Sequence, residues 1–315
     1  MDLFHPDRRH VLSVAQFERP DLDRLFELAE RCIPVALGDA VSEALRGRIL
    51  ANLFFEPSTR TRLSFGTAFL RLGGTVESSV GMQFSSMAKG ETLEDTVRVI
   101  SGYADAIVLR HPDLGSAQKA AEVSLCPIVN GGDGPGEHPT QALLDVFTIL
   151  RERGQVDGVH VALVGDLKYG RTVHSLARML GRYKNVTLTF VSPPSLGMPK
   201  SVTDILDRRG VTWRVVDSLV DATREADVLY VTRLQAERFS DPAEAARLAG
   251  SYTVDRRLLE EAGAADRVTI MHPLPRYGDL SPDVDDLPGA AYFRQAHYGV
   301  PVRMALFCRI FGVEP

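Results

Sequence analysis

The sequence has few of the residues that mark a disulfide framework, a metal centre or a membrane segment. Only three of its 315 residues are cysteine, at Cys32, Cys126 and Cys308, and they lie far apart. An odd number of widely spaced cysteines predicts buried, small hydrophobic residues in a reducing compartment. The first 20 residues carry charges throughout, and no apolar run approaches the ~20 residues of a transmembrane helix. The sequence therefore indicates a cytoplasmic protein that does not enter a membrane.

A net positive charge and the signatures of cofactor binding are also lacking. The net charge of -5 at pH 7 provides no basic surface for nucleic acid. No group of His, Asp and Cys has the spacing of metal ligands, and no nucleophile elbow is present. The glycine-rich segment 131–136 is a poor dinucleotide fingerprint because Glu137 stands where the third glycine is needed, and Gly165-Asp166 fails the same test. We expect no metal and no cofactor, and partners that are small molecules or proteins.

The length and the hydrophobic pattern indicate two α/β domains, each with a mostly parallel sheet flanked by helices. A chain of 315 residues suits two domains of about 150 residues each. Short apolar runs alternate with helical patterns in two blocks, as is typical of buried parallel strands. The boundary is expected in a leucine-rich helix over 139–153. The expected strands are 48–55, 104–110 and 126–130 in the first block, and 160–165, 186–191, 211–216, 228–231 and 268–272 in the second.

One strand end carries a cluster of hydroxyl and guanidinium groups. The apolar run 49–55 leads into a helix start that contains Ser58, Thr59, Arg60, Thr61 and Arg62. The first N–H groups of a helix have no intrahelical partners, so a phosphate here would meet the helix dipole, a hydroxyl and a cation together. Arg60 and Arg62 point about 200° apart on a helix, so only one of them can face the anion. Taken alone, a serine or threonine cap beside two surface arginines is the commoner arrangement.

His138 lies between the glycine-rich loop and the expected helix 139–153. Loop glycines permit a close approach to a ligand, and a neutral imidazole can donate a hydrogen bond to a carbonyl oxygen at pH 7. Gln141, one turn further on the same face, could hold a carbamoyl NH2 group. A histidine that only caps the helix is the alternative, which the local sequence leaves open. Structural roles are expected for His111, His160, His174 and His272.

Two arginines follow strands of the second block. Arg171 comes after the strand that ends at Gly165, and Arg233 after the strand that ends at Val231. Ligands of open α/β sheets bind at the carboxyl ends of the strands, so both arginines are placed for a substrate. Two such arginines suit a dicarboxylate, because each guanidinium can hold one carboxylate through two hydrogen bonds. As isolated residues, they would more often form surface ion pairs.

In combination, these segments resemble the catalytic chains of aspartate carbamoyltransferases. The resemblance extends from about residue 45 to residue 310, and the order and spacing of the motifs make it specific. Residues 272–276 read His-Pro-Leu-Pro-Arg, whereas ornithine carbamoyltransferases have His-Cys-Leu-Pro, so Pro273 favours an acidic acceptor. The matching motifs are 54–62, 85–92, 110–112, 137–141, 165–175, 232–238 and 272–276.

The resemblance implies the binding residues of two substrates, carbamoyl phosphate and L-aspartate. It assigns catalysis to Arg60, Thr61, Arg110 and His138. It assigns carbamoyl phosphate binding to these four residues together with Ser58, Thr59, Gln141, Pro273, Leu274 and Pro275. The carbonyls of Pro273 and Leu274 would accept from the carbamoyl nitrogen, and the Leu274–Pro275 bond would be cis. It assigns L-aspartate to Arg171, Arg233, Gln235 and Lys89.

The resemblance also implies how the chain is organised. Residues 1–145, joined by a C-terminal helix at about 290–315, would bind carbamoyl phosphate, and residues 146–289 would bind aspartate. The active site would lie in the cleft between the two domains, with Glu56 and Arg238 as candidates for a bridge that holds a closed form. Lys89 would reach the active site of a neighbouring chain, which implies a homotrimer. Regulatory or dihydroorotase chains as further partners stay open.

The implied activity is transfer of the carbamoyl group to the amine of L-aspartate, giving N-carbamoyl-L-aspartate and phosphate in pyrimidine biosynthesis. One alternative is a paralogue that acts on another acidic amine. A second is a catalytically silent trimeric scaffold for a partner enzyme. Silent paralogues usually lose substrate ligands, and none of the contact residues is missing here.

Overall fold

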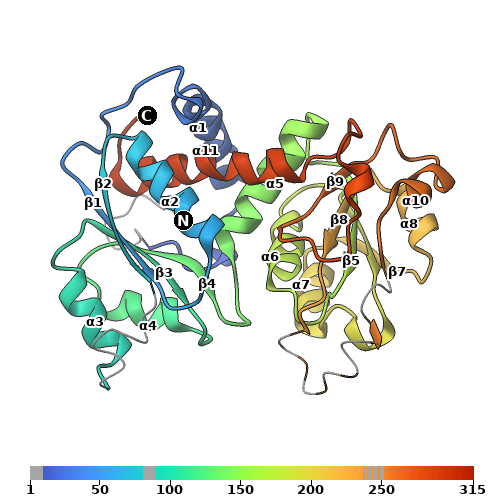
Figure 1. Cartoon of the computed structure of the whole chain (residues 1–315), viewed down its shortest axis with the longest axis horizontal. Helices are drawn as coiled ribbons and strands as arrows, with labels where there is room; N and C mark the ends of the chain where they lie inside the picture. Colours follow the sequence, from blue (N-terminus) through green and yellow to red (C-terminus); the bar gives the residue numbers. More distant parts are fainter. Residues whose placement is uncertain are drawn as a thin grey trace. The chain divides into compact units, whose positions relative to one another are not determined.

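The computed structural model describes residues 10–80, 90–236, 239, 241, 243, 247, 248 and 252–315. The chain divides into two compact units, the first unit with Met1–Leu143 and His297–Pro315 and the second unit with Leu144–Ala296. Each unit contains one parallel sheet with helices around it, which confirms the expected fold class (Figure 1). The chain passes from one unit to the other within α5 (Pro139–Arg153) and again within α11 (Tyr292–Phe311). No helix in the described ranges could span a lipid bilayer.

The first unit has a four-stranded parallel sheet in the order β2-β1-β3-β4. Its strands are β1 (Ile49–Phe54), β2 (Thr75–Val80), β3 (Ala106–His111) and β4 (Ile128–Asp133). The remaining elements of this unit are the 3-10 helix η2 (Val14–Gln16) and the helices α1 (Arg19–Leu37), α2 (Thr59–Arg71), α3 (Leu93–Ile100) and α4 (Ser116–Val123).

Alternate residues of these strands face two layers of helices. Leu53 of β1 and Ile107 of β3 pack with Val97 of α3 in one buried cluster. Helices α3 and α4 therefore cover one face of the sheet, while α1, α2 and the end of α11 lie on the other (Figure 1). On that second face, the ring of Phe307 in α11 lies with its centroid 4.9 Å from that of Phe69 in α2.

Strand β2 was not expected from the sequence. It contains Glu77, Ser78 and Ser79, and it lies at the edge of the sheet, where it pairs with β1. An edge strand needs no continuous apolar run, because fewer of its side chains are buried between helices. The pattern that identified the central strands therefore gave no signal for this one.

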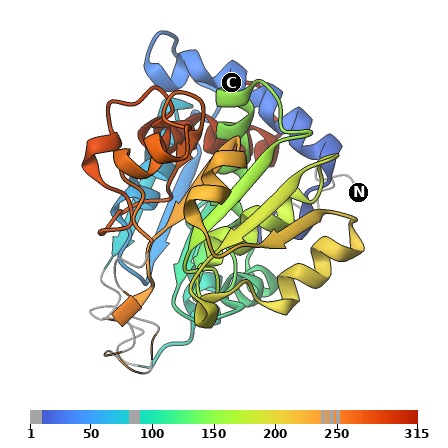
Figure 2. The same cartoon turned by 90° about the vertical axis from the view of Figure 1, so that its right-hand side faces the viewer.

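The second unit has a five-stranded parallel sheet in the order β7-β6-β5-β8-β9, seen with its twist in Figure 2. Its strands are β5 (His160–Gly165), β6 (Thr187–Val191), β7 (Thr212–Val215), β8 (Val228–Thr232) and β9 (Thr269–Met271). Its remaining elements are α6 (Arg171–Leu180), α7 (Lys200–Arg208), α8 (Leu219–Glu225), α10 (Arg256–Glu261) and the 3-10 helices η5 (Pro194–Leu196) and η7 (Pro282–Val284).

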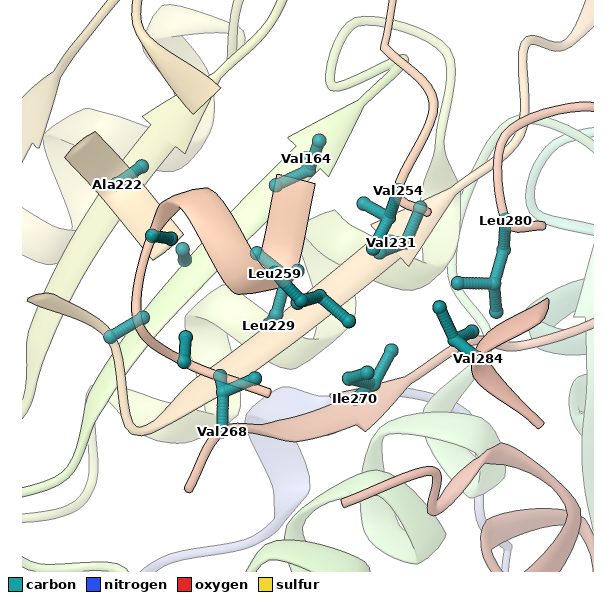
Figure 3. Close-up of a cluster of buried hydrophobic side chains, with 14 of the residues drawn as sticks. Val164, Ala222, Leu229, Val231, Val254, Leu259, Val268, Ile270, Leu280 and Val284 are labelled. Atoms are coloured by element: carbon teal, nitrogen blue, oxygen red, sulfur yellow. The ribbon is translucent and has the colours of Figure 1, made fainter. Parts of the chain in front are cut away.

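One buried hydrophobic cluster of the second unit joins residues of β5, β6, β8 and β9 to residues of α8 and α10. Figure 3 shows Leu229 of β8, Ile270 of β9 and Leu259 of α10 turned toward one another, and all three are fully buried. Each such buried side chain stabilises the folded state by about 1.5 to 3 kcal/mol relative to the same side chain exposed to water. The strand ends are thereby held in fixed positions, from which loops project.

The three cysteines are buried and free, as the sequence predicts.

Candidate active site

The start of α2 is suited to an anion. Ser58 is the N-cap residue, with φ -160 and ψ 90, and its side chain makes no capping hydrogen bond. The first turn of α2 contains no acidic residue, so the helix itself does not neutralise its positive end. Arg60 lies in this turn next to Thr59 and Thr61, and the residue as a whole is exposed. Desolvation nevertheless lowers the pKa of its guanidinium, which stays charged at neutral pH. Hydroxyls, N–H groups and a cation therefore meet at one helix end.

Arg110 lies on the neighbouring strand end. In the register of β1 and β3 it stands opposite Phe54, and its carbonyl accepts from the N–H of Phe55 (2.8 Å). Its Nη1 donates to the carbonyl of Gly131 (3.2 Å), and its Nε lies 3.3 Å from Oε2 of Glu56. These contacts hold the guanidinium at the carboxyl edge of the sheet, beside the segment that leads into α2.

Two carboxylates hold the loop that leads to His138. Asp133 accepts hydrogen bonds from the N–H of Gly115 (3.1 Å) and from the N–H of Glu137 (2.8 Å). Glu137 in turn accepts from the N–H of Val14 (2.7 Å). The local sequence shows only that acidic residues flank the glycines, because the N–H groups of Gly115 and Val14 come from other segments of the chain.

His138 is buried at the start of α5. Its carbonyl accepts from the N–H of Gln141 (3.1 Å) and of Ala142 (3.2 Å), so it occupies the capping position. Gln141 is half-buried in the first turn. The preceding loop requires glycine at Gly134, where φ is +49 and a Cβ would lie 2.0 Å from the carbonyl oxygen of Pro112. The capping position and a ligand-binding ring are compatible, since capping uses only the backbone of His138.

In the second unit, Asp166 connects the loops that carry the expected aspartate ligands. Its buried carboxylate accepts from the N–H of Tyr169 (2.9 Å) through Oδ1 and from the N–H of Gln235 (3.0 Å) through Oδ2. Tyr169 lies two residues before Arg171, and Gln235 lies two residues after Arg233. One carboxylate thus fixes both strand ends. The sequence pattern shows no sign of this role, because the N–H of Gln235 comes from a distant segment of the chain.

Both arginines lie at the carboxyl edge of the second sheet. Arg171 is buried as the first residue of α6, and Arg233 is half-buried, with its Nη1 donating to the carbonyl of Leu234 (2.9 Å). The two strand ends approach closely, because a Cβ on Gly165 would lie 2.1 Å from the carbonyl oxygen of Thr232. Arg171 and Arg233 therefore follow two strand ends that lie side by side.

The segment 272–276 follows β9 at the same edge. The Leu274–Pro275 peptide bond is cis, as the resemblance implies, and Leu274 has φ 53. Pro273 and Leu274 are half-buried. Within the described ranges, no hydrogen bond to the carbonyl of either residue is found. These two carbonyls are therefore acceptors with unused capacity.

Three of the other histidines have contacts of a structural kind. Nδ1 of His111 accepts from the N–H of Asp113 (3.1 Å). Nε2 of His160 lies 2.7 Å from Oγ1 of Thr189, and Nε2 of His174 lies 2.7 Å from the carbonyl oxygen of Leu167. Burial lowers the pKa of His111 and of His160, so both rings are neutral at pH 7. In the fourth, His272, Nδ1 accepts a hydrogen bond from the N–H of Leu274 in the segment 272–276.

The structure thus gathers the expected residues into two groups, each at the carboxyl edge of its own sheet. In the first unit these are Ser58, Thr59, Arg60, Thr61, Arg110, His138 and Gln141. In the second unit these are Arg171, Arg233, Gln235, Pro273, Leu274 and Pro275. Lys89 and Arg238 lie outside the described residues, and Glu56 is paired with Arg110.

Comparison with known families identifies both halves of the chain. Residues 9–151 match the carbamoyl-P binding domain of aspartate/ornithine carbamoyltransferases, and residues 157–310 match their Asp/Orn binding domain. The chain belongs to the aspartate/ornithine carbamoyltransferase family. The two family domains meet within a few residues of the end of α5.

Several relatives in the carbamoyltransferase family are similar over nearly their full length. The aspartate carbamoyltransferase catalytic subunit of Methanothrix thermoacetophila is 54% identical over 299 residues, covering 95% of this chain and 97% of that protein. The catalytic subunit of M. jannaschii aspartate transcarbamoylase has a TM-score of 0.89 at 48% identity, covering 96% and 98%. The Trypanosoma cruzi aspartate transcarbamoylase in complex with carbamoyl phosphate and aspartate has a TM-score of 0.90 at 42% identity, covering 97% of both chains.

Proposed function

We propose that this chain transfers the carbamoyl group of carbamoyl phosphate to the amine of L-aspartate, giving N-carbamoyl-L-aspartate and phosphate. The observation that carries the proposal is the pair Arg171 and Arg233, which stand on adjacent strand ends joined through Asp166. Two guanidinium groups at neighbouring strand ends suit a substrate with two carboxylates. The similar chains named above, which are aspartate carbamoyltransferases, support the same acceptor.

Carbamoyl phosphate binds first in this proposal. Its phosphate lies at the start of α2, where the residues that bind it are Ser58, Thr59, Arg60 and Thr61, with Arg110 from the next strand. Its carbonyl oxygen faces Thr61, Arg110 and His138, which stabilise the negative charge that develops there. Its NH2 group is held by Gln141 and by the carbonyls of Pro273 and Leu274, with Pro275 as part of the same loop.

L-Aspartate binds second, held by Arg171, Arg233 and Gln235, with Lys89 contributed by another chain. Its neutral amine attacks the carbonyl carbon and a tetrahedral intermediate forms. The bond from carbon to the phosphate oxygen then breaks, and the proton lost by the amine passes to the leaving phosphate. The reaction needs no covalent intermediate on the protein. Holding the two reactants together can supply about 7 to 11 kcal/mol of the acceleration.

The active form is a cytoplasmic homotrimer with shared sites, which takes part in pyrimidine biosynthesis. The first unit exposes large apolar side chains that another chain could cover: Val41 is 92% exposed and Leu70 is 57% exposed. Both residues line one surface hollow of about 450 Å³. Regulatory or dihydroorotase chains would be further partners of such a trimer.

An acceptor screen tests this function. Purified protein is given carbamoyl phosphate with L-aspartate, L-glutamate or L-ornithine, and the ureido product and released phosphate are measured. We expect product with aspartate, and at least a tenfold lower kcat/KM with the other two amines. A loss of this size is on the order of what one misplaced polar group of the substrate causes. Preference for another acidic amine would indicate the paralogue, and no turnover with any amine would indicate the silent scaffold.

Replacing Arg233 with alanine is expected to impair the use of aspartate. A carboxylate of the substrate would lose a charged hydrogen-bonding partner, at about 1.5 to 3 kcal/mol, which raises the KM for aspartate about 10- to 150-fold. Calorimetry should show carbamoyl phosphate binding within about twofold of the unaltered chain, since Arg233 does not touch that substrate in the proposal. Equal weakening of both ligands would count against the assigned role.

A further inference from the structure

His272 stands between the buried polar core of the second unit and the loop that contains Pro273 and Leu274. Its Nε2 is hydrogen-bonded to the carboxylate of Asp279, and its Nδ1 accepts from the N–H of Leu274 (2.8 Å). A backbone N–H can only donate, so Nδ1 carries no proton, and the proton of the neutral ring lies on Nε2. The ring therefore donates to Asp279 and accepts from Leu274.

Asp279 fixes this tautomer. Its other oxygen accepts from the N–H of Tyr277 (2.6 Å), so both of its oxygens serve as acceptors. Burial alone would raise the pKa of the Asp279 carboxyl, but the bonds from His272 and Tyr277 outweigh burial and the pKa lies below its usual value. An ionised carboxylate cannot donate, which keeps the histidine proton on Nε2.

The backbone of His272 is fixed separately. Its N–H donates to Oε1 of Gln295 (2.8 Å), while Nε2 of Gln295 donates to Oδ1 of Asp145 (2.7 Å). Oδ2 of Asp145 accepts from the hydroxyl of Tyr230 (2.8 Å). These residues are buried, and the carboxylate sets the orientation of the Gln295 amide because it can only accept. The histidine is thus held at both its main chain and its ring.

The backbone of Leu274 depends on this histidine. Its φ of 53 lies in the left-handed region, which leucine rarely adopts. Within the described ranges, the N–H group of Leu274 donates to Nδ1 of His272 and to no other acceptor. The carbonyls of Pro273 and Leu274 remain as acceptors.

We propose that His272 is a positioning residue that holds the carbonyls of Pro273 and Leu274 for the NH2 group of the carbamoyl donor. The inference rests on the proposed function. A carbamoyl group presents two N–H donors, whereas an acetyl group of nearly the same shape presents none. His272 thereby sets the preference of the site for a carbamoyl phosphate over an acyl phosphate.

Two replacements of His272 separate positioning from anchoring. His272→Asn keeps an acceptor for the N–H two residues on, because asparagine side chains form this turn readily. His272→Gln keeps an amide that can reach Asp279 but places no acceptor at the position of Nδ1. We expect His272→Gln to weaken carbamoyl phosphate binding about tenfold with acetyl phosphate binding unchanged, and His272→Asn to keep the ratio of the two affinities within about threefold of the unaltered chain.

Asp279→Asn tests the tautomer without changing the histidine. The N–H of Tyr277 needs an acceptor, so the amide oxygen of the new asparagine faces Tyr277 and its NH2 faces His272. Nε2 of His272 must then accept from that NH2, so the ring proton moves to Nδ1. There it points at the N–H of Leu274, and two donors face each other without an acceptor. Asp279→Asn is therefore expected to lower the ratio of carbamoyl to acetyl phosphate affinity about as much as His272→Gln does. It also keeps the inference testable if His272→Gln fails to fold.

The measurement is calorimetry of both ligands on each full-length variant, with the thermal midpoint as a check of folding. His160→Gln is the matched control, since His160 contacts Thr189 and Glu225 outside this loop, and its ratio should stay that of the unaltered chain. An unchanged ratio in both His272→Gln and Asp279→Asn would overturn the inference, as would equal loss of both ligands. If the unaltered chain failed to bind carbamoyl phosphate, the proposed function would fall and this inference with it.

Discussion

Replacing Arg60 with alanine is expected to lower kcat/KM by about 2 to 4 kcal/mol of transition-state binding, roughly 30- to 10³-fold. Arg60 lies in the first turn of α2, which contains no acidic residue, and desolvation already lowers the pKa of its guanidinium. A charge in such a place interacts more strongly with a phosphate than it would in water. In the proposed mechanism, the same group faces the charge that grows on the leaving phosphate, so the loss falls on kcat as well as on KM.

Arg62→Ala is the matched control for this prediction. Arg62 lies on the same helix, but its side chain points about 200° away from that of Arg60. The control should keep kcat/KM within about threefold, and both variants should keep their thermal midpoints within a few degrees, as is usual for substitutions near a surface. Near-native kcat/KM in the Arg60 variant would exclude the proposed phosphate site.

The sequence predicted the central strands because their residues are buried between helices. Leu53 and Ile107 belong to apolar runs that a buried parallel strand requires, and both are within the core of the first unit. Strand β2 escaped notice because Glu77, Ser78 and Ser79 tolerate the edge of a sheet. The hydrophobic pattern therefore identifies a strand only where burial on both faces requires apolar residues. Whether a strand lies at the edge depends on the whole sheet, so its own sequence does not reveal it.

The same limit applies to the candidate site. Arginines such as Arg171 and Arg233 could be placed from sequence because they follow strand ends, and strand ends have a known chemical use. The carboxylates of Asp133 and Asp166, which fix the loops, could not be placed in this way. Their partners, the N–H groups of Gly115 and Gln235, are determined by which strands become neighbours. A residue that supports a site through long-range contacts leaves no pattern in its own segment.

His272 illustrates the intermediate case. The sequence predicted a structural role, and the ring is indeed buried in a hydrogen-bonded network. What the sequence could not give is the direction of those bonds, which follows from the positions of Asp279 and Leu274 around the two ring nitrogens. The direction of these hydrogen bonds determines the role proposed for His272, because one ring nitrogen must accept while the other donates.

Mixing two inactive variants is expected to restore activity if the active site is shared between chains. In the proposed trimer, Lys89 acts on the substrate that is bound by Arg60 of the next chain. Arg60→Ala and Lys89→Ala homotrimers should each be nearly inactive, since every site lacks one of the two cations. Lys89 lies outside the described residues, so this prediction rests on the resemblance to aspartate carbamoyltransferases.

A hybrid trimer contains both variant chains, and one of its junctions must join an intact Arg60 to an intact Lys89. That junction is a complete site, so refolding the two variants together should recover up to about one native site in three for each hybrid. The amount of hybrid is measured by native mass spectrometry, and activity is compared with that of the separately refolded variants. A site formed within a single chain would stay defective in every mixture, because no chain carries both cations. Hybrids that form without any recovery of activity would therefore exclude the contribution of Lys89 from a neighbouring chain.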